Sequence, residues 1–283
     1  MIVMRWMAPL CAVSALLPTG SAQGGAPVLA AQRPPAVEAQ WESSDVRAAL
    51  DRSLYAVSVK IGAEQGGPVH VTAELENFSG KTITAYAVTF IAGYADGVQR
   101  EQSLTEDILG ETVLSRVPGV TVPTSAGTLN PHEVRPVKMS LPLGAGALPP
   151  VSATARVTMI IFEDRTAVGD PHWIQTVFDG RRTSSQQDEA LLTELRELLA
   201  RPEIRRSGEP EQTSALREAL AGRIAELRSA GVSAGWTEGQ LTKLQLFQDA
   251  LLRSRQHFDQ MMSHWDILQR AASEQSKLEV TAQ

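Results

Sequence analysis

One cluster of acidic side chains in this sequence has the residue types for binding a cation. Glu163, Asp164 and Asp170 lie close together in the chain, with His172 just beyond them. Carboxylate oxygens are the ligands that calcium prefers, although an EF-hand loop takes its ligands at alternate positions and ends with a glutamate. That pattern is not met here. The same residues fit a solvated turn in which Asp170 caps a helix, and we expect that role.

Two histidines, His257 and His264, are seven residues apart and would share one face of a helix. Zinc sites on a single helix favour a spacing of four, and no acidic partner completes an HExxH motif. The sequence also lacks a GxSxG elbow, a phosphate-binding glycine-rich loop and a dinucleotide fingerprint. We therefore predict no catalytic residue, no resident metal and no cofactor.

A further cluster near the carboxyl end is apolar and large enough to bind something. It comprises Phe258, Met261, Met262 and Trp265. These side chains could form an exposed contact for a protein partner or a lipid. They could equally form the core of a helical bundle or its contact with a neighbouring domain, which we favour.

The elements that position these groups change type at residues 151–170. The first half of that stretch alternates and ends in the apolar run of a buried strand, and a polar turn at 163–166 follows. Before it, the period of the apolar residues is two. After it, the period is about 3.6, which indicates helices. The sequence therefore predicts an α+β protein, with an antiparallel β-sandwich over 54–170 and helices over 171–275.

Within the sandwich, alternating runs predict strands from Leu54, over 69–76, over 82–94 and over 134–141. Pro136 places the last of these at a sheet edge. Residues 101–126 break the rhythm, and the spacing of Leu104, Ile108 and Leu109 predicts a short helix followed by a loop. Asn77 begins a turn that also matches the N-glycosylation pattern.

The run Leu75-Glu76-Asn77-Phe78-Ser79-Gly80-Lys81-Thr82-Ile83, the later Tyr94-Ala95-Asp96-Gly97 and the Leu129-Asn130-Pro131 before a strand resemble the FxLYD-type immunoglobulin-like domains of secreted bacterial proteins. The chain departs from that family by lacking its Phe-x-Leu-Tyr-Asp string and by the insertion at 101–126. The resemblance implies an immunoglobulin-like fold and an adhesion, sensing or scaffolding role outside the cytoplasm. It brings no catalytic residues with it.

The helical region begins at Pro171 with Asp170 as its cap. It predicts one long helix with a weak polar middle, or two helices, ending before Pro202. A second helix follows over 213–230, and a third with a capping box at 237–240 runs to about 275. This pattern is typical of a helical hairpin or a three-helix bundle, with a frayed tail at 276–283.

The amino-terminal residues 1–22 have the pattern of a secretory signal peptide. Arg5 precedes an apolar stretch of about twelve residues, which is shorter than the roughly twenty needed to span a bilayer. Small residues precede a cleavage point before Gln23, and residues 23–53 indicate a flexible linker with one short helical turn capped by Asp45. The alternatives are an uncleaved anchor, or a lipoprotein acylated at Cys11.

The charge and cysteine content narrow the function further. The 283-residue chain has a net charge of −6 without a basic stripe, which argues against a general nucleic-acid binder. Its single cysteine, Cys11, lies in the predicted signal segment, so a mature chain would use no thiol chemistry. We expect a periplasmic or extracellular, non-catalytic binding or scaffolding protein. It would contact a protein partner or itself through the C-terminal helices and have no integral membrane span after cleavage. The alternatives are an envelope hydrolase with its site between sandwich and helices, and a structural oligomer or coiled coil built by residues 237–275.

Overall fold

The computed structural model describes residues 43–63, 69–116, 129–141, 148–205, 209–230 and 238–276. The predicted signal peptide and most of the predicted linker lie outside these residues. The described chain forms two compact units. The first contains the strands and extends into the first turns of α4, and the second contains the rest of the helical region together with residues 110–116.

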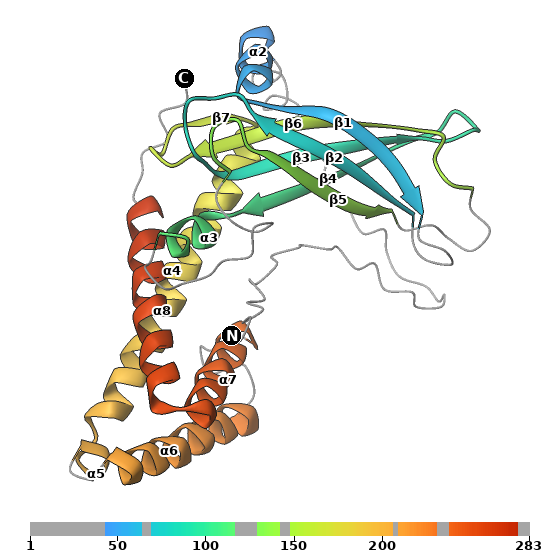
Figure 1. Ribbon diagram of the computed structural model, residues 1–283. Coiled ribbons are helices and arrows are strands. Elements are labelled where there is room, and N and C mark those ends of the chain that lie inside the picture. The colour runs from blue at the N-terminus through green and yellow to red at the C-terminus, as the bar shows by residue number, and fades with distance from the viewer. Residues whose placement is uncertain are drawn as a thin grey trace, which may run out of the picture. The chain divides into compact units, whose positions relative to one another are not determined.

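The first unit is a sandwich of two antiparallel sheets, which confirms the predicted α+β fold (Figure 1). One sheet has the order β1 (Leu54–Ala63), β2 (Val69–Asn77) and β5 (Val134–Leu141). The other has the order β4 (Gln99–Asp107), β3 (Ile83–Gly93), β6 (Ser152–Phe162) and β7 (Ala167–Gly169). In the constant-type immunoglobulin domain the fourth strand lies beside the fifth. Here β4 pairs with β3 instead.

The core of the sandwich lies between the two sheets. Every second residue of β2 is fully or nearly buried, as its alternation predicts. These side chains meet β3 and β6, whose inward residues include Tyr86, Phe90 and Ile160. β5 lies at the edge of its sheet with Pro136 exposed, as predicted.

The short helix predicted from the spacing of Leu104, Ile108 and Leu109 is present, but it begins only at Leu109. Residues 99–107 form the edge strand β4, and only Leu109–Leu114 form a helix, α3. Leu104 belongs to the strand and pairs with Val88. The first five residues of β4 are all exposed, so no apolar alternation marks this strand in the sequence.

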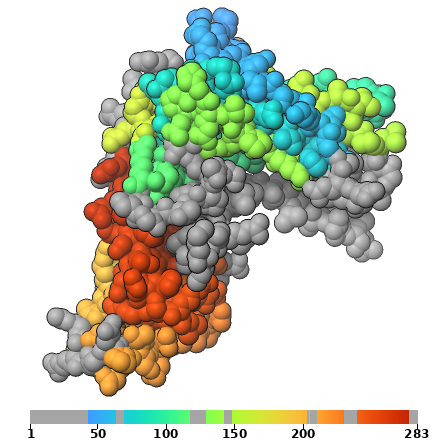
Figure 2. All heavy atoms as spheres, in the orientation of Figure 1, coloured from blue at the N-terminus to red at the C-terminus, as the bar shows by residue number. Residues whose placement is uncertain are grey.

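Helix α2 (Ser44–Ser53) occupies the last ten residues of the predicted linker, where the sequence indicated a short helical turn. Its cap is Ser43, whose hydroxyl accepts a hydrogen bond from the Val46 amide, and Asp45 lies in the first turn instead. The helix lies against β1, β6 and β7, and stands on the sandwich surface in blue in Figure 2. Arg47 donates a 2.8 Å hydrogen bond to the carbonyl of Val157 on β6. The short strand β7 pairs only with residues 159–161 of β6, so it does not reach Val157.

The helical region comprises α4 (Pro171–Ala200), α5 (Pro202–Arg205), α6 (Glu209–Ala230), α7 (Glu238–Arg253) and α8 (Arg255–Ser276). α4 is one continuous helix, which decides between the two predicted alternatives. The predicted third helix is broken at Ser254, so that α8 turns back along α7 (Figure 1). The rings of Phe247 and Phe258 are 5.7 Å apart, whereas a straight helix would separate these residues by about 16 Å.

Candidate functional site

Two of the three acidic candidates for cation binding, Asp170 and Asp164, have structural roles. Asp170 is buried and caps α4, accepting a 2.9 Å hydrogen bond from the His172 amide. Asp164 accepts hydrogen bonds from Thr166 and lies 2.5 Å from Lys81 Nζ. Burial is the largest single influence on the Asp164 carboxyl and raises its pKa, but the hydrogen bonds and charge of Lys81 and the hydrogen bonds of Thr166 together outweigh it and hold the pKa below its usual range. Glu163 joins no ligand set, because no three metal-binding side chains lie together within the described residues.

The two histidines do not form a common site. His257 lies at the break between α7 and α8, where its Nδ1 is 2.6 Å from the Ser254 hydroxyl oxygen. That oxygen also accepts a hydrogen bond from the His257 amide, at 3.1 Å. Ser254 is therefore the cap of α8, and its hydroxyl is engaged by both the amide and the ring of His257. Burial lowers the pKa of His264 on the same helix.

The apolar cluster near the carboxyl end lies mainly in the core of the helical unit. Phe258, Met261 and Trp265 are buried, and Met262 is half-buried. Phe258 and Trp265 both pack on Phe247 of α7. Burial leaves these three side chains without the exposed surface that a partner contact requires.

A polar cluster within the sandwich joins the two sheets. Tyr86 of β3 is fully buried, and its hydroxyl donates a hydrogen bond to the carboxylate of Glu106, the residue opposite it on the neighbouring strand β4. Arg135 enters from β5 of the other sheet and pairs with Glu133 at 3.2 Å. Burial raises the pKa of Tyr86 well above its usual value, and the nearby Glu106 carboxylate adds to this. The phenol therefore remains a proton donor, with Arg135 of the other sheet close enough to oppose part of the rise.

This cluster gives a specific pH dependence. A phenol whose folded-state pKa is raised stabilises the fold below about pH 10, and this contribution is lost as the pH rises toward its folded-state value. We expect tyrosinate absorbance to show one of the three tyrosines silent in the native protein and titrating only on alkaline unfolding. Tyr86→Phe should remove the silent group, whereas Tyr55→Phe should not. Full titration of all three in the folded state would contradict this.

An open hollow in the helical unit runs between α4 and α6, with a volume of about 640 Å³. We call it the α4–α6 groove. It is lined by Gln186, Glu189, Ala190, Thr193, Glu194, Glu197, Leu198, Arg201, Arg223 and Glu226. The residues from position 186 to 201 recur every three or four residues, so they form one stripe on the helix, about 22 Å long.

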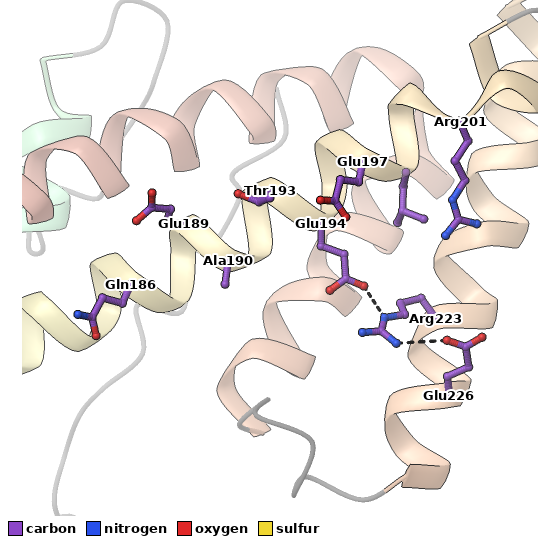
Figure 3. A pocket seen from close by; sticks show the side chains of 10 residues that line it. Gln186, Glu189, Ala190, Thr193, Glu194, Glu197, Arg201, Arg223 and Glu226 are labelled. Carbon is purple, nitrogen blue, oxygen red and sulfur yellow. Dashed lines mark hydrogen bonds and ion pairs between the residues drawn. The ribbon is translucent and has the colours of Figure 1, made fainter.

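The floor of the groove is fixed by ion pairs. Arg223 of α6 donates to Glu194 of α4 and lies 3.3 Å from Glu226 of its own helix (Figure 3). Its hydrogen bond to Glu194 raises the pKa of the Arg223 guanidinium. The side chains of Glu189, Glu197 and Arg201 make no ion pair with any residue that the structure describes. Two carboxylates and one guanidinium are therefore available to a ligand.

Sequence reasoning missed this groove for a physical reason. The polar stripe on α4 is visible in the spacing of Gln186, Thr193 and Glu197, but such a stripe is the ordinary solvated face of an amphipathic helix. Only the packing of α6 beside it turns the stripe into one wall of a hollow. Arg223 and Glu226 carry no signal in the sequence that assigns them to α4.

Comparisons with known proteins add no functional assignment. No family model matches the chain, and no curated protein matches it. A solved structure described as the X-ray structure of Northeast Structural Genomics Consortium target SoR45 is 14% identical, with a TM-score of 0.24. The match covers 42% of this chain and 80% of that one. At that TM-score neither fold nor function is carried over.

None of the helices in the described part of the chain has the length and apolar character that crossing a membrane requires.

Proposed function

We propose that this is an exported, non-catalytic binding protein whose α4–α6 groove holds a polar segment of a protein partner. The observation that carries the proposal is the preformed groove, whose floor is fixed by the Arg223 ion pairs and whose rim carries unpaired charges. The helices already fix the backbone of the groove, so binding does not have to order the main chain, which favours recognition.

The chemistry of the partner follows from the charges that remain. Glu189 and Glu197 would face basic side chains, and Arg201 would face an acidic one at the far end of the stripe. Ala190 and Thr193 lie between them with short side chains, so the backbone of a bound segment would come close to α4 (Figure 3). The partner is therefore a segment with basic residues at one end and an acidic residue at the other.

A scaffolding role fits the same proposal, with the sandwich as a separate module that resembles the FxLYD type. Against the alternative of a hydrolase, each carboxyl whose pKa is shifted is paired with its own lysine: Asp164 with Lys81, and Asp188 with Lys243. Neither carboxyl belongs to the α4–α6 groove, where a catalytic pair would be needed to make it an active site.

The proposal is tested by photo-cross-linking in the producing cell. A photoreactive residue replaces the exposed Ala190 in the groove, and in a control protein it replaces the exposed Asp249 of α7. We expect a product of defined mass from position 190 only. Equal products from both positions, or none from 190, would contradict a groove site.

Mass spectrometry of the protein purified from the same cells tests export. A signal peptide over 1–22 predicts a mature chain beginning at Gln23. A chain in the cell envelope that still begins at Met1 would show that the segment is retained, and a chain found only in the cytoplasm would contradict export.

A further inference from the structure

The sequence from α7 to α8 has an uninterrupted helical pattern, although the structure divides it into two helices. A single residue, Ser254, separates them, and no glycine or proline occurs between Gln240 and Ser276. Sharp bends in helices usually occur at proline, at glycine or where a side chain intrudes into the hydrogen-bond ladder. The local sequence therefore favours one continuous helix, and the bend at Ser254 must be held by other interactions.

Part of the helical ladder continues through the bend. The Ser254 amide donates to the carbonyl of Ala250 at 3.1 Å, and the Phe258 amide donates to the carbonyl of Ser254 at 3.3 Å. Both are the i to i−4 bonds of an α-helix. Straightening the joint would therefore keep these bonds and change only the few residues around them.

Side chains replace the ladder bonds that the bend removes. In a continuous helix the carbonyl of Leu251 would accept from the Arg255 amide. Here it accepts from the Arg217 guanidinium of α6, at 3.0 and 3.3 Å. The Ser254 hydroxyl accepts the His257 amide, which would otherwise bond to the carbonyl of Arg253. The bent and straight forms therefore satisfy the same backbone groups in two different ways.

Contacts from neighbouring helices hold α8 in place. Trp265 lies 6.3 Å from the Phe247 ring and 5.0 Å from Lys243 Nζ, both on α7. Gln269 bonds to Ser185 of α4 at 3.4 Å, and Asp266 bonds to Arg196 of α4 at 2.6 Å. A second copy of the chain presents the same α4 and α7 surfaces, so the α8 of one copy can make every one of these contacts with the other copy.

From this we propose that the protein forms a domain-swapped dimer. The joint at Ser254 straightens, residues 238–276 become one helix of about 58 Å, and each copy's α8 packs on the α4 and α7 of the other. The partner is a second copy of this chain, and the proposal does not depend on the α4–α6 groove. Leu252, 59% exposed beside the joint, lies where the two straightened helices would cross.

The test uses paired cysteines at a contact that the swap transfers between chains. In the full-length chain with Cys11→Ser, Ser185→Cys on α4 and Gln269→Cys on α8 place one thiol on each side of that contact. Monomer and dimer are separated by size exclusion with light scattering, oxidised, and run on a denaturing gel without reductant. We expect disulfides within one chain in the monomer fraction and between two chains in the dimer fraction.

Two variants shift the equilibrium in opposite directions. Arg217→Met removes the hydrogen bonds to Leu251 and should favour the dimer by about tenfold or more. Inserting Gly-Ser-Gly after Ser254 lengthens the joint, lets α8 fold back without strain, and should leave only monomer. Circular dichroism checks that both variants keep their helices. A dimer with only intrachain disulfides, or no dimer from the wild type or Arg217→Met over a wide concentration range, would overturn the proposal.

Discussion

Lys243→Met is expected to destabilise the helical unit by about 3–5 kcal/mol at neutral pH, the usual cost of leaving a buried charge without its partner. Lys243 Nζ lies 2.5 Å from the Asp188 carboxylate, and the two side chains are 11% and 5% exposed. Burial raises the pKa of Asp188 even though Lys243 opposes this. Without the lysine, that pKa would rise further.

The pH dependence identifies the mechanism. In Lys243→Met, the folded state prefers a neutral Asp188, so the variant should be least destabilised below about pH 4 and lose stability as the pH rises toward 7. Asp188→Asn leaves a buried ammonium instead, and its deficit should persist at low pH. The double variant Asp188→Leu with Lys243→Met should recover most of the loss. Urea unfolding at several pH values measures all three, and equal deficits at every pH would contradict a buried pair.

Asn77→Ala is expected to destabilise the sandwich by about 2–4 kcal/mol, because it removes four hydrogen bonds at a site with no exposure. Its Nδ2 donates to the carbonyls of Lys81 and Leu129, at 2.9 and 3.0 Å. Its Oδ1 accepts from the amide and the hydroxyl of Ser79, at 3.0 and 2.6 Å. One side chain thus ties the β2–β3 turn to the segment that leads into β5.

Asn77→Asp should be at least as damaging, since a carboxylate oxygen would replace Nδ2 opposite two carbonyl oxygens. The control is Asn130→Ala, an exposed asparagine whose side chain bonds only to Glu133, and it should cost about 0.5–1 kcal/mol or less. Chemical denaturation measures the difference. An Asn77→Ala effect no larger than that of Asn130→Ala would contradict this role. Because the Asn77 side chain is buried and fully bonded, the folded protein does not offer it for glycosylation.

Strands with one solvent-exposed face and one buried face could be predicted from the sequence, because the alternation of polar and apolar residues follows burial directly. β2 and β5 follow that pattern, and the turn role of Asn77 follows from its residue type. β4 could not be predicted, because both faces of this edge strand are solvent-exposed over its first five residues, so polar and apolar residues do not alternate there. At the bend, the only local signal is the capping residue type of Ser254 itself, because the carbonyl of Leu251 is held by Arg217, a residue of another helix.

The polar middle of α4 shows the same limit. In the sequence, residues 181–188 weaken the helix. In the structure, Arg181, Ser185 and Asp188 are buried and meet Gln275, Gln269 and Lys243. These partners lie 94, 84 and 55 residues further along the chain. Periodicity identifies apolar seams, but it does not identify polar groups that are buried because distant partners satisfy them.

The central claim is that the α4–α6 groove binds a segment with basic residues, and the most direct measurement is the cross-link from position 190 after charge reversal. Glu189→Lys with Glu197→Lys should abolish the product, since both carboxylates would become repulsive to a basic segment. The matched control reverses Glu211 and Glu218, two exposed glutamates of α6 outside the groove, and should leave the product unchanged. A product that survives reversal in the groove, or disappears equally in the control, would contradict the account.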